Sequence, residues 1–326
     1  MTAVNGKRVL FITTKNIDYL RNVQEIRLLK ESAQSVTVLG FADKSYIKRL
    51  LKLYVQLLFM STASFDCVFI GFAPQLILPF FSFKFRKLIV LMDFFISVYD
   101  TMVFDRAKFK DGTLPARLCK WLDTACIRCA DAVVCDTNAH GDYFAEEFGV
   151  SREQITTLYL EADTSIYYER EMLKPPAFQD KFVVLYFGSV LPLQGYEVIL
   201  EAMAMLKDQH DLHFYFIGPI KNKADAVQSD NITYIDWLAQ TDLAEKIGYA
   251  DLCLAGHFHT TIMKAKRTIP GKAYIYEAMG KPMILGDNAA THELYREDER
   301  HYFVEMGSAK ALVDKILEVK ATLSKH

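Results

Sequence analysis

Short apolar runs alternate with helical patterns along the whole chain of 326 residues. Runs rich in Val, Ile, Leu and Phe predict strands in the first half at Arg8–Thr14, Ser35–Phe41, Cys67–Phe72, Lys87–Phe94 and Ala132–Asp136. A second series is predicted at Phe182–Gly188, Leu212–Gly218, Ile232–Tyr234, Leu252–Ala255 and Pro282–Gly286. Such uniformly apolar runs are typical of strands buried on both faces of a parallel sheet. Helices of the second half are predicted at Tyr196–Lys207, Leu243–Ala250, Lys272–Met279 and Ala309–Leu323.

Two series of alternating strands and helices predict two α/β domains, each with a doubly wound parallel sheet. The chain length suits two domains of ordinary size. The break between the series lies within residues 162–181, where Lys174-Pro175-Pro176 disfavours helix, as a connector would. We therefore expect domains at 1–165 and 166–326, with the last helix able to pack back on the first domain. Because ligands of open α/β sheets bind beyond the carboxyl ends of the strands, the expected site is the cleft between the two domains.

Composition and charge exclude several classes of function. The chain has 38 Lys and Arg against 40 Asp and Glu, a formal net charge of −2, so no general basic surface for nucleic acid is expected. No apolar run reaches the roughly 20 residues of a membrane-spanning helix, and no cleavable signal is visible, so the cytoplasm is the expected location. Cys126 and Cys129 form a CxxC, but no second ligand pair follows at comparable spacing. We therefore expect reduced thiols, no metal site and no cofactor.

Residues 43–60 combine basic and apolar positions at helical spacing. The basic residues of this segment are Lys44, Lys48, Arg49 and Lys52. A basic amphipathic helix can lie on an anionic membrane surface, and the alternative is an ordinary domain helix with a solvated basic edge. Lys84, Arg86 and Lys87 stand among phenylalanines and extend the same pattern. This favours peripheral contact of Lys44–Met60 with the inner membrane.

The segment from Lys264 to Asn288 has the chemistry of an anion site. Its basic residues, Lys264, Lys266, Arg267 and Lys272, stand beside a Pro-Gly turn and a predicted short helix. A helix N-terminus carries unpaired N–H groups and about half a positive charge, so neighbouring basic side chains favour a phosphate ligand there. Gly188 and Gly195 lie in an earlier strand–loop–helix segment, and they allow the backbone to approach a bound group closely.

These segments resemble the nucleotide-diphosphate-binding signature of glycosyltransferases with the GT-B fold, in particular family 4. The sequence from Lys264 to Lys272 is similar to the KAxRxIPNK segment of a bacterial subgroup. The resemblance implies that Arg267 and Lys272 hold the donor diphosphate. Gly286–Glu293 resembles the GDSPAxxE end of the same signature, which implies that Asp287 lies near the donor sugar. Asp287 can equally cap the helix predicted to follow it.

The chain departs from the family pattern at three donor positions. The family has Arg after the first loop glycine and Lys before the second, where this chain has Ser189 and Gln194. It also has Glu three residues after the signature lysine, where this chain has Ile275. Either Glu277 takes over ribose binding, or ribose binding is unusual, or catalysis has been lost. The complete set of expected donor-binding residues is Gly188, Ser189, Gln194, Gly195, Arg267, Lys272, Glu277 and Asp287.

Polar residues of the first half supply acceptor-side candidates. Residues 93–106 resemble the pattern DxFISxYDTxxxDR of the same subgroup, and residues 131–144 resemble DxxxxDTxxHxxYF. Asp93 and Asp100 are the candidate catalytic residues, and Asp93 would orient sugar hydroxyls or the incoming nucleophile. Its alternative role is to satisfy loop amides at a strand end, and a lone histidine is more often structural. The expected acceptor-side residues are Ser97, Tyr99, Arg106, Asp136, Thr137 and His140.

The resemblance runs from about Asp66 to Glu293 and implies a GT-B glycosyltransferase. The expected reaction transfers a sugar from a nucleotide-diphosphate sugar to a lipid-linked or growing bacterial glycan, with retention and without a metal. The alternative is a non-catalytic GT-B subunit that binds a glycan, a lipid or a partner transferase. Ser189, Gln194 and Ile275 favour that alternative, whereas Arg267 and Lys272 oppose it. A phosphorylase-like enzyme is a weaker alternative, because nothing marks a pyridoxal site.

Overall fold

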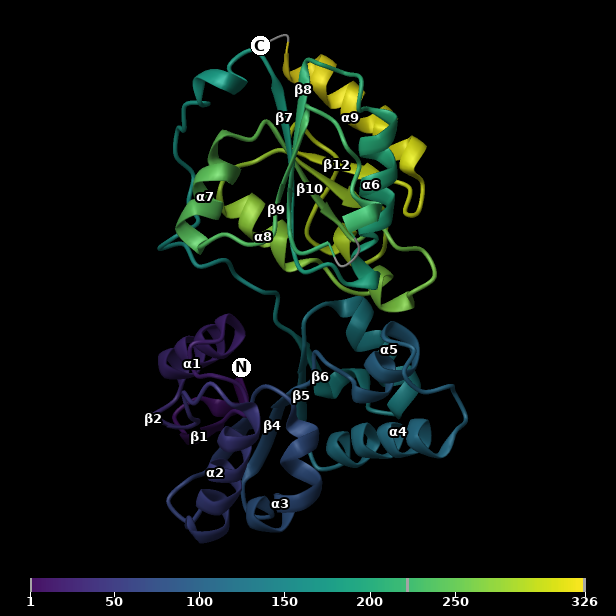
Figure 1. Ribbon diagram of the computed structural model, residues 1–326. Coiled ribbons are helices and arrows are strands. Elements are labelled where there is room, and N and C mark those ends of the chain that lie inside the picture. The colour runs from purple at the N-terminus through teal and green to yellow at the C-terminus, as the bar shows by residue number, and fades with distance from the viewer. Residues whose placement is uncertain (1, 221–222, 325–326) are drawn as a thin grey trace. The chain divides into compact units, whose positions relative to one another are not determined.

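The computed structural model describes residues 2–220 and 223–324. The chain forms two compact units, Met1–Glu161 and Ala162–His326 (Figure 1). The division therefore follows Glu161, close to the domain boundary expected after residue 165. Each unit is described here by itself.

The first unit is built on a six-stranded sheet with strand order β2-β1-β3-β4-β5-β6, in which every neighbouring pair is parallel. Its strands are β1 (Arg8–Ile12), β2 (Ser35–Leu39), β3 (Cys67–Ile70), β4 (Ile89–Asp93), β5 (Ala132–Cys135) and β6 (Ile155–Thr157). Its helices are α1 (Leu20–Ser32), α2 (Tyr46–Phe59), α3 (Leu78–Phe85), α4 (Leu114–Ile127) and α5 (Asn138–Phe148).

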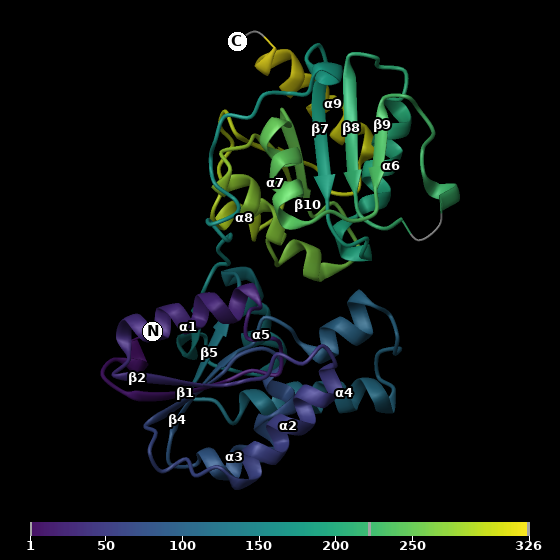
Figure 2. The ribbon, with the colours of Figure 1, turned by 60° about the vertical axis from the view of Figure 1, so that its left-hand side comes forward.

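The helices of the first unit cover both faces of its sheet (Figure 2). Alternate strand residues point to opposite faces, so each strand contributes to two cores. On one face Phe11 and Phe69 pack with Leu29 of α1. On the other face Leu10 and Val68 belong to the core that α2, α3, α4 and α5 complete. This two-sided burial explains why the strands read as unbroken apolar runs.

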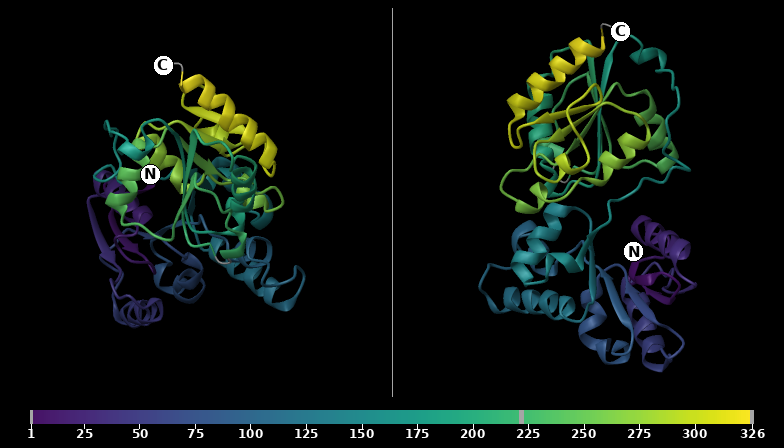
Figure 3. Two further views of the ribbon diagram at one scale, coloured as in Figure 1. Left: turned by 45° about the horizontal axis from the view of Figure 1, so that its top comes forward. Right: turned by 180° about the vertical axis from the view of Figure 1, so that it is seen from behind.

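The second unit has the strand order β12-β11-β10-β7-β8-β9, again with every pair parallel. Its strands are β7 (Phe182–Phe187), β8 (Leu212–Ile217), β9 (Ile232–Ile235), β10 (Leu252–Gly256), β11 (Met283–Gly286) and β12 (His301–Val304). Its helices are α6 (Tyr196–Met205), α7 (Gln240–Tyr249), α8 (Gly271–Ala278) and α9 (Ala309–Leu323). The last helix, α9, packs against α6 and β12 of its own unit (Figure 3).

The structure confirms two doubly wound α/β domains with parallel sheets, and all ten predicted strands are present. Two strands are absent from the prediction. β6 has only three residues, and β12 follows the charged run Arg296–Arg300, so neither produces a long apolar signal. The six cysteines are free thiols, and Cys119 and Cys126 pack in the core between α4 and the sheet, as predicted. None of the described helices is long and apolar enough to cross a membrane.

Candidate functional site

The reversal of strand order in the second sheet marks a place for a ligand. The chain moves from β7 outwards to β9 and then returns to β10 on the other side of β7. Ligands of open α/β sheets bind beyond the carboxyl ends of the strands that flank such a reversal. Gly188 follows β7, and His257 follows β10, so both lie at this edge.

Lys272 occupies this edge from the first turn of α8. It is buried, and its Nζ donates a hydrogen bond of 2.9 Å to Oε1 of Gln194. Nζ also lies 4.9 Å from the centre of the Tyr186 ring, whose hydroxyl donates to the same Gln194 oxygen at 2.5 Å. Burial lowers the pKa of Lys272 to about 7. A phosphate oxygen would restore the charged form, because an opposite charge nearby raises the pKa of an ammonium group.

Gly188 makes the close approach of Lys272 possible. A Cβ at Gly188 would lie 2.7 Å from Oε1 of Gln194 and 3.3 Å from Cε of Lys272. The loop that begins here therefore depends on a glycine for space as well as for backbone freedom. The structure thus brings together three of the predicted donor residues, Gly188, Gln194 and Lys272, from two distant segments.

Gly195 joins the same loop to the segment after β10. Its φ is +64°, and a Cβ would lie 2.5 Å from the backbone of both Phe258 and His259. The N–H of Phe258 donates to the carbonyl of Gln194 at 3.1 Å. The predicted role of Gly195, close approach of backbone, is therefore used within the protein, and α6 begins directly after it.

The pKa of His257 responds to the positively charged lysines at this edge. Burial, Lys272 and Lys264 together hold the pKa of His257 well below its ordinary value. Its Nδ1 has no hydrogen-bond partner among the described residues. The low pKa of His257 thus reflects its burial and the two lysines near it.

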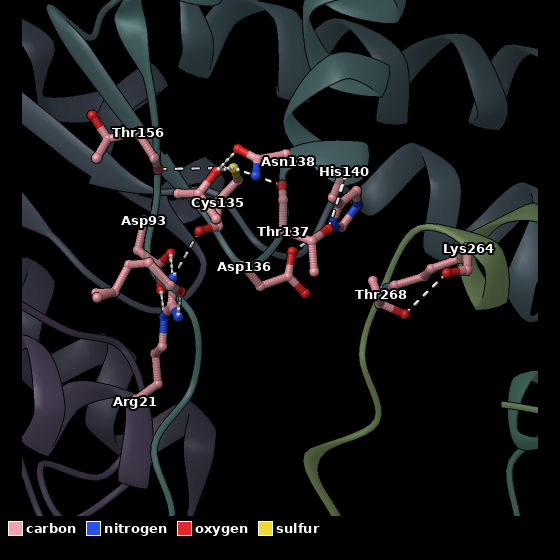
Figure 4. Close-up of polar contacts among 12 residues, drawn as sticks. Arg21, Asp93, Cys135, Asp136, Thr137, Asn138, His140, Thr156, Lys264 and Thr268 are labelled. Carbon is pink, nitrogen blue, oxygen red and sulfur yellow. Dashed lines mark hydrogen bonds and ion pairs between the residues drawn. The ribbon is translucent and has the colours of Figure 1, made fainter. Parts of the chain in front are cut away.

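Arg267 and Ser189 complete the donor residues of this edge. Arg267 is half-buried and ends the turn Met263–Lys266, where its N–H donates to the carbonyl of Lys264 at 3.0 Å. The same carbonyl accepts a hydrogen bond of 2.9 Å from Oγ1 of Thr268 (Figure 4). Ser189 is exposed and follows Gly188 directly. Thr268 fixes the turn from which Arg267 projects.

A mostly apolar pocket of about 520 Å³ adjoins the glycine loop. Gly188 and Ser189 line it together with Ile217, Asp236 and Trp237, from the carboxyl ends of β8 and β9. The Trp237 side chain is largely exposed. A flat aromatic ligand group can enter such a pocket, with the aromatic face of Trp237 available for stacking.

Glu277 does not join the Lys272 group. Its Oε2 lies 2.6 Å from Nε2 of His301 in β12, and the other ring nitrogen of His301 lies 3.0 Å from Asp298. Glu277 is about 140° further around α8 than Lys272, whereas Ile275 is only about 60° away. Ile275 is half-buried. The described contact of Glu277 is thus a partly buried one with the His301 side chain.

The alternative role of Asp287 as a helix cap is wrong. Its Oδ1 lies 2.7 Å from Nε2 of His292, and both side chains are exposed. Asn288 acts as the local cap instead, because its Oδ1 accepts from the N–H of Thr291 at 3.1 Å. Only a short turn, Thr291–Glu293, follows, where a helix was expected. The side-chain amide of Asn288 also donates to the carbonyl of Gly286, which an aspartate cannot do.

In the first unit, Asp93 forms a buried ion pair at the carboxyl end of β4. Nε and Nη2 of Arg21 contact its two oxygens at 3.0 and 2.9 Å (Figure 4). Arg21 also donates to the carbonyls of Leu158 and Cys135. Glu25 lies 3.5 Å from Arg21, and burial and the charge of Asp93 raise its pKa well above the ordinary value. One arginine thus faces two carboxyl groups in the interior of the first unit.

Asp136 and His140 form a second pair on the neighbouring strand end. His140 is buried, and its Nδ1 lies 2.7 Å from Oδ1 of Asp136. Burial raises the pKa of Asp136, but His140 and Arg21 outweigh it and give a net lowering. Oγ1 of Thr137 accepts from the N–H of His140 at 3.1 Å and caps α5. The structure therefore brings Asp93, Asp136, Thr137 and His140 to one edge, because β4 and β5 are adjacent.

Asp123 organises the loop after β4. Its carboxylate accepts hydrogen bonds from Oγ of Ser97 at 2.7 Å and from the N–H of Tyr99 at 2.8 Å, and also from Gln75 and the N–H of Val98. Burial raises the pKa of Asp123, while these donors oppose the rise. Ser97 and Tyr99 are thus held by Asp123 in the interior.

The remaining first-unit candidates have other surroundings. Oγ of Ser97 accepts from the N–H of Asp100, which is buried and begins the π-helical turn Asp100–Asp105. The hydroxyl of Tyr99 donates to Asp111 at 2.8 Å. Arg106 is exposed at the end of the π-helical turn.

Sequence reasoning missed the partners that fix these groups. Arg21 and Glu25 are spaced i, i+4 within a helix, which looks like an ordinary surface pair. The burial of both follows only from the position of α1 over β4 and β5. Asp123 was likewise concealed in a helical stretch, although a single acid among Leu, Cys and Trp is a signal for a buried partner.

Comparison with known proteins places the second unit in a family. Residues 181–321 match the family model described as Glycosyl transferases group 1. The second unit therefore carries a domain of this kind, and the prediction of a glycosyltransferase domain is confirmed. The narrower assignment to family 4 stays a prediction. No curated protein sequence matches the chain significantly.

Solved structures share the fold of the whole chain. HepE of Anabaena in complex with UDP gives a TM-score of 0.64 at 14% identity, over 98% of this chain and 91% of that chain. Sucrose-phosphate synthase from Thermosynechococcus elongatus gives 0.67 at 12% identity, over 97% and 90%. The apo form of the lipopolysaccharide outer core galactosyltransferase WaaB gives 0.62 at 14% identity, over 97% and 90%. These similarities confirm the two-domain α/β fold of GT-B proteins.

Proposed function

We propose that the chain transfers a sugar from a nucleotide-diphosphate sugar to a lipid-linked or growing glycan, with retention and without a metal ion. The observation that carries the proposal is the meeting of Lys272, Gln194 and Gly188 at the strand-order reversal of a glycosyl transferases group 1 domain. One similar protein adds support, since HepE was solved with UDP and with UDP-glucose.

The donor diphosphate would bind beside Lys272 and Arg267. Lys272 supplies a mobile point charge, and Arg267 a planar group that can grip two phosphate oxygens. The N-terminus of α8 adds its dipole from the same side. These positive charges would stabilise the departing diphosphate, which is the task that a divalent cation performs in other folds.

The base of the nucleotide would enter the pocket beside Gly188 and Ser189. This pocket of about 520 Å³ is mostly apolar, and Trp237 offers an aromatic face. Asp236 adds a carboxylate to its lining, which can accept hydrogen bonds from base N–H groups. Ile275 replaces the usual ribose-binding carboxylate, so more of the affinity would come from the base and the phosphates.

The acceptor would bind at the carboxyl edge of the first sheet. Asp93 and Asp136 carry negative charge there and can accept hydrogen bonds from sugar hydroxyls. Arg21 holds both oxygens of Asp93 in place, so that Asp93 can position the incoming nucleophile. A lipid-linked acceptor would be reached at the cytoplasmic face of the inner membrane.

The alternative is a non-catalytic subunit with the same fold. Ser189, Gln194 and Ile275 each replace a usual donor contact, which favours this alternative. Lys272 opposes it, because its hydrogen bond to Gln194 compensates its burial only in part, and burial still lowers its pKa to about 7.

Calorimetric titration with UDP, GDP, ADP and CMP tests the proposal. We expect one of the nucleoside diphosphates to bind, and Arg267→Ala to weaken that binding by about tenfold or more, since a charge-assisted bond contributes ~1.5–3 kcal/mol. Lys207→Ala is the matched control, because the exposed Lys207 precedes β8, at the opposite end of the strands. Turnover is then measured with the matching nucleotide sugars and membrane lipid acceptors. If none of the four nucleotides binds, the result favours the non-catalytic subunit.

A further inference from the structure

The exposed apolar side chains of the first unit gather on one face of the sheet. We propose that this face, formed by α2, α3 and α4, docks onto lipid bilayers that contain anionic phospholipid. The face is here named the α2–α4 face, and it lies opposite α1 (Figure 2). The proposal deepens the proposed function by naming the surface through which a lipid-linked acceptor would be reached.

The distribution of large exposed apolar residues distinguishes this face. Those on the three helices are Ile47, Leu51, Val55, Leu58, Phe59, Phe80, Phe83, Leu114, Leu118 and Trp121. The rest of the described first unit adds only Val23 and Phe104. Soluble monomers normally scatter such residues singly, and their concentration on one face marks an interaction surface.

Helix α2 presents a continuous apolar stripe to solvent. Ile47, Leu51, Val55 and Leu58 follow one another at spacings of four, four and three, so they lie on one side of the helix. Leu53 is about 200° away from Leu51 and is buried in the core. The helix is therefore apolar on its outer side as well as on the side that faces the sheet.

The charge of this face has one sign. The sequences of α2 and α3 contain no acidic residue, and the one acid of α4, Asp123, is buried. The exposed basic residues on or directly beside the three helices are Lys44, Lys48, Lys52, Arg86, Lys87, Arg117, Lys120 and Arg128. Lys52 and Lys120 pair with Asp43 and Glu147 at the edges of the face. In a chain of net charge −2, a face without exposed acids is complementary to anionic lipid headgroups.

A hollow beside α2 suits an apolar group. It has a volume of about 710 Å³, and Leu51, Val55 and Phe59 line it together with Lys52. The Phe59 side chain is 86% exposed, at the C-terminal end of α2. Nζ of Lys84 donates to the carbonyls of Leu57 and Leu58, so this end of the helix is fixed on α3. Phe59 can thus insert between lipid chains while the lysines contact headgroups.

A second copy of the chain fits this face less well than a bilayer does. Two identical faces would bring lysines of the same sign together, and like charges across an interface disfavour association. An anionic membrane needs no such juxtaposition.

Co-sedimentation with vesicles tests the proposal without any donor or acceptor. The probes are vesicles of phosphatidylcholine alone and vesicles in which about a third of the lipid is anionic phosphatidylglycerol. We expect binding to the anionic vesicles, weak or absent binding to the neutral ones, and release in 0.5 M salt, where the Debye length is below about 5 Å. The chain has two tryptophans, so the fluorescence of the Trp237→Phe variant comes from Trp121 alone. We expect this emission to shift to shorter wavelength when the protein binds the vesicles.

Two pairs of variants separate the charge from the apolar stripe. Lys44→Gln with Lys48→Gln should weaken partitioning by about 25-fold, since each lysine near such a surface contributes about fivefold. Lys30→Gln with Lys207→Gln, on other exposed surfaces, is the matched control and should change nothing. Leu51→Ser with Phe59→Ser should abolish binding, whereas Met205→Ser with Leu294→Ser, exposed in the second unit, should not.

The proposal fails if the protein stays in the supernatant with both vesicles, or if neutral and anionic vesicles bind it equally. It also fails if sedimentation velocity shows a dimer that Leu51→Ser with Phe59→Ser dissociates, because the face is then an interface between copies. Nucleotide titration of the same variants distinguishes this failure from failure of the proposed function. The α2–α4 variants leave the donor residues intact and should bind the nucleotide unchanged.

Discussion

Nζ of Lys272 donates a hydrogen bond of 2.9 Å to the side-chain oxygen of Gln194, 78 residues away in sequence. Gln194 stands where the family-4 pattern has a lysine. A lysine there would place a second ammonium group against the first, whereas glutamine supplies an acceptor. Gln194 therefore gives Lys272 a hydrogen-bond partner in the interior without a ligand.

Nucleotide affinity should decrease as the pH rises above 7. Burial lowers the pKa of Lys272 from 10.5 to about 7, so the free protein loses this charge as the pH rises through about 7. Binding of a diphosphate then requires uptake of a proton, and the Kd should rise by up to about tenfold per pH unit. Calorimetry from pH 6.5 to 9 in buffers of different ionisation enthalpy measures both effects. Lys272→Met should bind weakly at every pH, and a pH-independent Kd in the unaltered protein would contradict the prediction.

Gln194→Glu should weaken nucleotide binding although it preserves the shape of the side chain. The new carboxylate would pair with Lys272, raise its pKa and repel the diphosphate. We expect the Kd to rise by about tenfold or more, which corresponds to ~1.4 kcal/mol or more. Gln209→Glu, at an exposed position before β8, is the control for added charge. Equal affinities of the two variants would exclude contact between Gln194 and the phosphate site.

Gly188→Ala should disturb the donor edge more than a glycine substitution in open space. The added Cβ would lie 2.7 Å from Oε1 of Gln194, which two donors hold in place. Gly112→Ala is the control, since its φ is +78° and no atom lies within 4 Å of the added Cβ. Both changes cost about 1–2 kcal/mol of backbone strain, but only Gly188→Ala should also weaken nucleotide binding. Urea denaturation and calorimetry measure the two quantities.

Glu25→Gln should stabilise the protein increasingly as the pH rises. The folded pKa of Glu25 lies well above its ordinary value of 4.5, because of burial and of Asp93. Its contribution to stability is therefore fully present below about pH 4.5 and is lost as the pH rises towards the folded pKa. Glutamine stays neutral and avoids this loss.

Asp93→Asn is the matched comparison for Glu25→Gln. It leaves Arg21 buried without its bidentate partner and should cost about 3–5 kcal/mol. Urea denaturation at pH 5 and pH 8 compares the two variants. Equal destabilisation by both at pH 8 would show that Glu25 is ionised.

Ile275→Glu and Glu277→Gln test how the ribose is bound. Glu277 contacts the buried His301, and glutamine keeps an acceptor there, so Glu277→Gln should cost about 1 kcal/mol and leave the nucleotide Kd unchanged. Ile275 is on nearly the same side of α8 as Lys272, so a carboxylate there should tighten nucleoside diphosphate binding by several-fold. A weaker affinity in Glu277→Gln would instead identify Glu277 as the ribose contact.

Much of the fold could be predicted from the sequence, because strands buried on both faces of a parallel sheet are short runs of apolar residues. Ala309–Leu323 was predicted with both of its ends correct, since its apolar period and its capping serine are local. The same argument located Gly188, Gln194 and Lys272, which follow a strand or open a helix.

The contacts of the site were harder to predict, because they join distant residues. Asp93 was recognised as a polar strand end, but its partner Arg21 lies 72 residues away on a helix. A cap was considered for Asp287 and not for Asn288, since both residue types cap helices and only the carbonyl of Gly286 discriminates between them. Glu277 was one of three alternatives for the ribose, and its contact with His301 depends on a strand that the sequence does not reveal.

The contact between Gly195 and Phe258 has a consequence for the thermodynamics of binding. Because backbone meets backbone there, the loop after β7 and the segment after β10 cannot move independently, even without a ligand. Little conformational entropy then remains to be lost when a nucleotide binds, and rigid, preformed sites bind with little structural adjustment. Substitution of Gly195 by a larger residue would separate the two segments, and nucleotide association would then include a slow ordering step.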